Sequence, residues 1–145
     1  MSAPAIRGAR PEDAAAVSRL LGELGHPAPE EEVRARLEEL ARLASHVVLV
    51  AESASGVVGA ASAFVSPVLH RPGLVGRISV MVVAEGTRGT GVGTRLLQAM
   101  EEALAERGAT RLELTSNVRR ADAHAFYEKR GWRKQGFRFE KTAAP

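Results

Sequence analysis

The chain has 145 residues, of which 45% are apolar and 26% are charged. These proportions are ordinary for a soluble globular protein, and we expect one domain over residues 1–145. Lys and Arg exceed Asp and Glu by only 20 − 17 = 3, which gives no general nucleic-acid footprint. The absence of cysteine excludes disulfides and thiol catalysis, and it suits a reducing compartment.

The N-terminal region carries charges and no apolar run, so we expect no signal peptide, no membrane span and a cytoplasmic protein. Aromatic residues make up only 4% of the chain, so aliphatic side chains must fill the core.

The first third of the chain predicts a short edge strand at Ala5–Arg7 and then two helices. Pro11 and the two acids after it open the first helix, since these residues suit a helix N-terminus. Its apolar residues recur at helical spacing, at Val17, Leu20, Leu21 and Leu24. Glu30 begins the second helix, whose apolar face holds Val33, Leu37, Leu40 and Leu43. His26 and His46 are interpreted as boundary residues without a role.

The middle third predicts strands. Val47–Ala51 and Val57–Val65 form an antiparallel pair around a turn. We expect a loop over Ser66–Gly73, because it holds two prolines, and a third long strand over Leu74–Val83.

The last third predicts a strand at Arg111–Thr115, a helix at Ala121–Lys129 that ends at Gly131, and a final hairpin over Trp132–Lys141. The order is βααβββαβαββ. It predicts an α/β sandwich in which helices flank a mixed central β-sheet.

One stretch carries readable chemistry: the loop Arg88-Gly89-Thr90-Gly91-Val92-Gly93, between the strand that ends at Val83 and a helix expected over Thr94–Arg107. Its glycines let a ligand approach the backbone closely. The first N–H groups of the following helix have no internal partner and favour an anion. Arg88 adds positive charge, so the loop suggests a pyrophosphate site.

Several readings of this loop compete. A dinucleotide fingerprint needs Gly-x-Gly-x-x-Gly, which differs from the spacing here. A P-loop needs Lys and then Ser or Thr after the last glycine, where this chain has Thr94 and Arg95. A glycine-rich turn without a ligand stays open. The remaining pattern, Arg/Gln-x-x-Gly-x-Gly/Ala of the GNAT acyltransferases, is matched by Arg88, Gly91 and Gly93.

Over nearly its whole length the chain resembles the GNAT N-acyltransferase superfamily. Four features occur in the order of that family: the apolar strand to Val83, the Arg88–Gly93 loop, the segment Ala123–Tyr127, and Gly131-Trp132. Within the superfamily, the segments that look most like the aminoalkylphosphonate N-acetyltransferases are Glu113–Asn117, Asp122–Tyr127 and Phe137–Lys141.

The resemblance implies acetyl-CoA as co-substrate. Backbone groups of Met81 and Val83 would pair with the pantetheine arm, and N–H groups of the strand near Val82 would polarise the thioester carbonyl. The expected donor contacts in full are Met81, Val82, Val83, Arg88, Gly89, Thr90, Gly91, Val92, Gly93 and Thr94, with Asn117 or Arg120.

Tyr127 matches the general acid of the family, which protonates the departing thiolate. A phenol has a pKa of about 10 and a thiol a pKa of about 8.5. Proton transfer from Tyr127 to the thiolate is therefore nearly balanced in free energy. The alternative is that Tyr127 only packs beside Phe126.

Two positions depart from the family pattern. Many members carry a Glu on the strand before the loop, whereas Arg77–Met81 holds no acid, and Ser79, His70 and Glu85 are weak substitutes for a base. The Asn that often lies seven residues before the Tyr is Arg120 here, and Asn117 lies ten before it. We expect no metal ligand.

These observations predict transfer of acetyl from acetyl-CoA to a primary amine of a small molecule by direct attack. Acetylation of a protein N-terminus or lysine is an alternative, as is a non-catalytic acyl-CoA-binding regulatory module. We expect neither nucleic acid nor a membrane as partner, and a homodimer stays an option. The expected acceptor loops, Gly25–Glu32 and Ser66–Gly73, carry no motif.

Overall fold

The computed structural model describes residues 3–116, 121–136 and 138–143. The chain divides into two compact units, Met1–Glu113 and Leu114–Pro145. Among the described residues, no helix has the length and apolar character that a membrane span requires.

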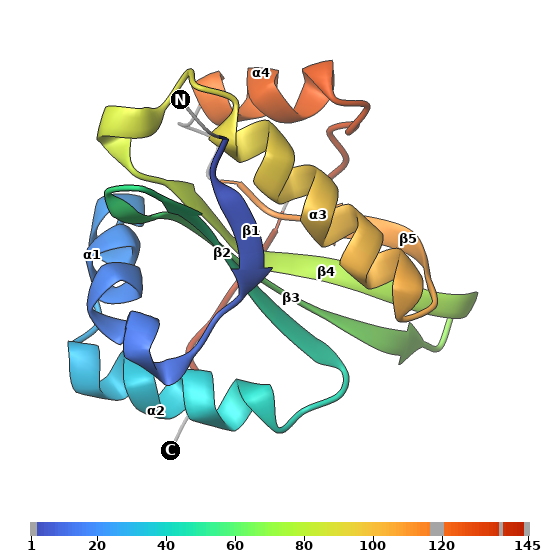
Figure 1. Ribbon diagram of the computed structural model, residues 1–145. Coiled ribbons are helices and arrows are strands. Elements are labelled where there is room, and N and C mark those ends of the chain that lie inside the picture. The colour runs from blue at the N-terminus through green and yellow to red at the C-terminus, as the bar shows by residue number, and fades with distance from the viewer. Residues whose placement is uncertain (1–2, 117–120, 137, 144–145) are drawn as a thin grey trace. The chain divides into compact units, whose positions relative to one another are not determined.

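The first unit is built on a five-stranded sheet in the order β1-β2-β3-β4-β5 (Figure 1). Its strands are β1 (Ala5–Gly8), β2 (His46–Ser53), β3 (Gly56–Val68), β4 (Arg71–Val83) and β5 (Ala109–Leu114). The first four strands pair antiparallel. The hydroxyl of Thr110 donates to the carbonyl of Leu74, and Glu113 pairs with Arg77. Residue numbers therefore rise in the same direction along both strands, so β5 runs parallel to β4. The sheet is therefore mixed, as predicted.

Helices cover both faces of this sheet. The 3-10 turn Pro11–Asp13, α1 (Ala14–Leu24) and α2 (Glu30–Ala41) lie on one face, and α3 (Val92–Glu106) lies on the other (Figure 1). One core cluster joins Leu20 of α1 and Leu37 of α2 to Val50, Ala60 and Val82 of the strands. None of the buried apolar residues of the described chain is aromatic, and all but Met100 are aliphatic, as expected from the low aromatic content.

Glycines on β3 and β4 let α3 and β5 approach closely. A Cβ built on Gly59 would lie 3.3 Å from Cδ2 of Leu96 on α3. A Cβ on Gly76 would lie 3.0 Å from Cδ2 of Leu112 and 3.1 Å from Cδ1 of Leu104. These close contacts hold α3 tightly against the face of the sheet opposite α1 and α2. They therefore also keep the start of α3 near the end of β4.

The structure corrects three expected boundaries. The loop expected over Ser66–Gly73 is wrong, because β3 runs to Val68 and β4 starts at Arg71. A register shift between Pro67 and Val68 lets the proline sit in the ladder, since an irregular position tolerates a missing N–H. The central helix begins at Val92 instead of Thr94, so Val92 and Gly93 belong to its first turn.

The final hairpin expected over Trp132–Lys141 does not form in the described residues 132–136 and 138–143, which hold no strand. Gly136 has a positive φ of 65°, which interrupts the extended backbone that a strand needs. The helix α4 (Ala121–Lys129) forms with the predicted bounds.

Candidate functional site

A bulge in β4 changes which backbone groups face each side of the strand. Val80 pairs with Ser62 and Ile78 pairs with Ala63, which leaves Ser79 as the extra residue. Its hydroxyl donates to the carbonyl of Ser62 at 3.2 Å. Bulges are common beside functional sites, because they re-aim the backbone that follows.

After this bulge, the backbones of Met81 and Val83 face away from β3. The N–H of Ala84 donates to the carbonyl of Val58 at 2.8 Å, so these two residues form a hydrogen-bonded pair. Bonded and non-bonded pairs alternate along an antiparallel ladder. Val82 opposite Ala60 is therefore bonded, whereas Met81 opposite Ala61 and Val83 opposite Gly59 are not. Their polar groups point toward the β5 side.

Strand β5 ends before it reaches this stretch. Its contacts place Thr110 at Leu74 and Glu113 at Arg77, and the strand ends one residue after Glu113. In the sheet order of the described strands, no strand follows β5 on that side of β4. The outward N–H and C=O groups of Met81 and Val83 can therefore receive the amides of an extended ligand, as an added strand would.

The predicted glycine loop follows directly. A 3-10 turn (Glu85–Thr87) leads from β4 into it, and α3 begins at Val92. Gly89 and Gly91 have positive φ angles of 82° and 88°, and a Cβ added at either would meet nothing within 4 Å. Gly91 caps α3, so the orphan N–H groups of the first turn lie beside open space. This is the arrangement that an anion requires.

Arg88 connects the loop to the strand. Its Nε lies 3.4 Å from the carbonyl oxygen of Val83, which is one of the outward-facing groups. A second tie runs from α1: Oε1 of Glu23 accepts the N–H of Glu85 at 2.8 Å. The end of β4, the loop and the start of α3 thus form one connected surface in the first unit.

Tyr127 lies on α4, in the second unit, in a well-defined local setting. The N–H of Trp132 donates to the carbonyl of Tyr127 and the N–H of Gly131 to that of Glu128, which is a Schellman ending with Gly131 at φ 90°. The rings of Tyr127 and Trp132 meet edge-on at 6.2 Å between centroids, and those of Phe126 and Tyr127 at 5.3 Å. Arg130 stacks over Phe126 at 3.7 Å.

The other two candidates, Asn117 and Arg120, lie outside the described residues. The structure therefore brings together the predicted positions from Met81 to Thr94 and describes Tyr127 within its own helix. Among the described residues, no group of three or more His, Asp or Glu side chains is placed to hold a metal ion.

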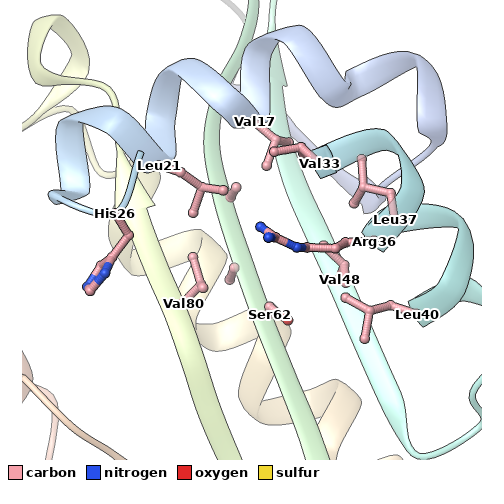
Figure 2. A pocket seen from close by; sticks show the side chains of 12 residues that line it. Val17, Leu21, His26, Val33, Arg36, Leu37, Leu40, Val48, Ser62 and Val80 are labelled. Carbon is pink, nitrogen blue, oxygen red and sulfur yellow. The ribbon is translucent and has the colours of Figure 1, made fainter. Parts of the chain in front are cut away.

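A cavity of about 240 Å³ opens between α1, α2 and the sheet (Figure 2). The helices contribute Val17, Leu21, Val33, Leu37 and Leu40 to its lining, and the strands contribute Val48, Ala60, Ala61, Ser62 and Val80. His26 and Arg36 complete it. The cavity exists because the residues of β3 that face it are small. Larger side chains at these positions would fill the space below the helices.

Sequence reasoning assigned no role to His26 and did not consider Arg36. The signal for Arg36 was present, because it follows Val33 by three residues and so lies toward the same face of the helix. The run of small residues in the Val57–Val65 strand was also visible. What the sequence could not show is that these two features face each other.

A network of charged side chains elsewhere in the first unit has a structural role. The Arg7 guanidinium contacts both carboxylate oxygens of Asp13 at 2.9 Å and also reaches Glu52 at 3.1 Å. The hydrogen bonds from Arg7 lower the pKa of Asp13, and the same contacts raise that of Arg7. Asp13, only 8% exposed, also accepts the N–H of Arg10, so this network ties β1 to the helix start.

Comparison with known proteins identifies the family of the chain. The model of the acetyltransferase (GNAT) family matches residues 14–132. The chain is 39% identical over 86 residues to an aminoalkylphosphonate N-acetyltransferase of Salmonella typhimurium, covering 59% of this chain and 56% of that protein. It therefore spans little more than half the length of that relative.

A second relative is the glucosamine 6-phosphate N-acetyltransferase 1 of Oryza sativa, 37% identical over 133 residues, or 85% of this chain and 79% of that protein. The fold matches a solved aminoglycoside N-acetyltransferase in complex with CoA, with a TM-score of 0.86 at 16% identity over 99% of this chain and 97% of that one. The family match covers most of the chain, and the chain therefore belongs to the acetyltransferase (GNAT) family.

Proposed function

We propose that this chain moves the acetyl group of acetyl-CoA to the primary amine of a small molecule by direct attack. The observation that carries the proposal is the pair of outward-facing backbones at Met81 and Val83, placed directly before the glycine loop. The relatives named above support a small-molecule acceptor, because they are N-acetyltransferases of an aminoalkylphosphonate and of an amino sugar phosphate.

The donor would lie along the end of β4. The two amides of the pantetheine arm would pair with the backbones of Met81 and Val83, and the Arg88–Val83 contact would give way to that pairing. The pyrophosphate would rest on Gly89, Gly91 and the first N–H groups of α3, near the charge of Arg88. Thr90, Val92, Gly93 and Thr94 complete this binding stretch, and Asn117 or Arg120 would contribute from outside the described residues.

The chemical step needs a polarised carbonyl. Because the N–H of Val82 itself faces β3, an outward-facing N–H beside it, at Met81 or Val83, would supply this polarisation. The neutral amine nitrogen attacks the thioester carbon, the C–S bond breaks, and the sulfur leaves with the bonding electrons. Tyr127 would donate its hydroxyl proton to that sulfur. The nitrogen would release its extra proton to solvent, and solvent would return a proton to Tyr127. The rings of Phe126 and Trp132 hold the Tyr127 ring in place, as a proton donor requires.

The acceptor would enter the cavity between α1 and α2, which reaches β4 at Val80, next to Met81. None of the twelve residues that line it is acidic. His26 extends from the end of α1 at the rim, away from the centre of the cavity (Figure 2). The amine would therefore lose its proton to solvent before it attacks.

The test is release of free CoA thiol from acetyl-CoA with a panel of small amines and, in parallel, a lysine peptide and a peptide with a free N-terminus. Turnover with small amines alone supports the proposal. Faster turnover with either peptide favours protein acetylation. Binding of acetyl-CoA by calorimetry without release of thiol from any acceptor identifies a binding module and contradicts the proposal.

A further inference from the structure

The cavity between α1 and α2 has a chemistry that selects among amines. Nine of its twelve lining residues are aliphatic, and the other three are His26, Arg36 and Ser62. A sugar ring in such a cavity would leave several hydroxyl groups without hydrogen-bond partners, which is costly. An aliphatic or aromatic body would bury its surface against valine and leucine side chains instead.

Arg36 supplies the one charged group in the lining. Figure 2 shows its guanidinium reaching from α2 over the middle of the cavity, above the strands that carry Ser62 and Val80. One of its nitrogens contacts Glu32 at 3.2 Å, in an ion pair whose side chains are 58% and 57% exposed. Such a pair is weak, and a guanidinium carries five donors, so Arg36 keeps donors for a second anion.

The two ends of the cavity differ. Val80 lies next to the strand backbone proposed for acetyl-CoA, so the reacting amine belongs at that end. Arg36 comes from the opposite wall, on α2. A molecule that satisfies both ends carries an amine at one end, an apolar body, and an anionic group that reaches the guanidinium.

We propose that the acceptor is a primary amine with an aliphatic or aromatic body and one anionic group, which Arg36 binds. This inference rests on the proposed function, since it takes the cavity as the acceptor site. It departs from the substrates named for the two relatives in one respect. The lining favours a hydrocarbon body over a sugar or a very short chain.

The experiment compares amines in matched pairs by release of CoA thiol. The probes are 6-aminohexanoate with hexylamine, and 4-(aminomethyl)benzoate with benzylamine. Glucosamine 6-phosphate represents a sugar body, and 2-aminoethylphosphonate represents a very short chain. We expect the highest kcat/KM for the first member of each pair. Direct calorimetric binding of 6-aminohexanoate in the presence of CoA provides a readout that does not depend on turnover.

Two variants test the role of the Arg36 charge, and we expect them to change the KM in opposite directions. Arg36→Gln should raise the KM for 6-aminohexanoate by about five- to tenfold and leave that for hexylamine nearly unchanged. Glu32→Gln frees the guanidinium, so it should lower the same KM by about two- to threefold. Arg34→Gln is the matched control, because Arg34 is exposed on the same helix and does not line the cavity.

Two results overturn the inference and are distinguishable. If glucosamine 6-phosphate or 2-aminoethylphosphonate turns over best, and Arg36→Gln behaves like Arg34→Gln, the assigned acceptor class is wrong while acetyl transfer stands. If no amine releases thiol although acetyl-CoA binds, the proposed function fails and the inference fails with it.

Discussion

The carboxylate of Glu23, near the end of α1, accepts the backbone N–H of Glu85, 62 residues later, at 2.8 Å. This bond ties a helix of the proposed acceptor cavity to the turn that leads into the glycine loop. It also satisfies the first N–H of that turn, which has no partner within the turn itself.

Removing this acceptor should loosen the donor loop. We expect Glu23→Ala to raise the KM for acetyl-CoA by a few fold, about 1 kcal/mol or less in binding. Glu23→Gln keeps an oxygen that can accept the same bond, so it should retain most of the affinity. Equal effects of the two substitutions on the KM would show that the bond does not position the loop.

Gly91→Asp should weaken acetyl-CoA binding at least about tenfold, or about 1.4 kcal/mol, because it places a carboxylate beside the proposed pyrophosphate site. Calorimetry on the folded variant measures this directly. Gly56→Asp is a matched control, since Gly56 also has a positive φ and open space around it but lies at the start of β3, directly after the β2–β3 turn. Unchanged affinity in Gly91→Asp would remove the loop from the donor site.

Tyr127→Phe should lower kcat by at least about tenfold, because it removes only the proton donor. The ring contacts with Phe126 and Trp132 do not need the hydroxyl, so the end of α4 should stay intact. Circular dichroism and acetyl-CoA affinity provide the controls. A kcat within about a factor of two of the parent, with chemistry limiting the rate, would make Tyr127 a packing residue.

The rate should rise with pH. A free alkylamine has a pKa of about 10.4, so the neutral fraction grows from about pH 7 to about pH 9, and kcat/KM should follow it. His26→Gln should show the same rise, because the ring lies at the rim of the cavity. If kcat/KM of the parent is flat over this pH range and kcat/KM of His26→Gln rises with pH, His26 acts as a base in the parent.

Asp13→Asn should destabilise the fold near neutral pH, by about 1.5–3 kcal/mol, since it breaks charged hydrogen bonds to Arg7. The hydrogen bonds from Arg7 lower the pKa of Asp13 in the folded state. Its stabilisation is therefore present above the unfolded pKa of about 3.9 and is lost as pH falls through the lower folded value.

Denaturant titrations of the parent and of Asp13→Asn at several pH values measure the difference between their free energies of unfolding. The two free energies of unfolding should converge as the solution becomes acidic. Glu52→Gln should cost less, because the Glu52 side chain is 45% exposed and its ion pair is screened by solvent. A constant difference between the parent and Asp13→Asn across the acidic range would contradict the linkage.

Local patterns in the chain were sufficient for most of the fold. Helical spacing of leucines located α1 and α2, and the run of β-branched residues located β2. Glycines before a helix predicted a candidate anion-binding loop, because positive φ angles and orphan N–H groups are properties of a few consecutive residues. The Schellman ending of α4 at Gly131 is local in the same way.

Three features depended on the packed structure. Strands β3 and β4 pair on both sides of a register shift that takes in Pro72, and Pro67 keeps a place in the ladder, because the pairing of two long strands outweighs the local cost of the prolines. The outward direction of Met81 and Val83 follows from a bulge at Ser79, which one strand alone does not reveal. The cavity with Arg36 arises only where two helices rest on the small side chains of β3, since a space between elements is a property of their packing and of no single segment.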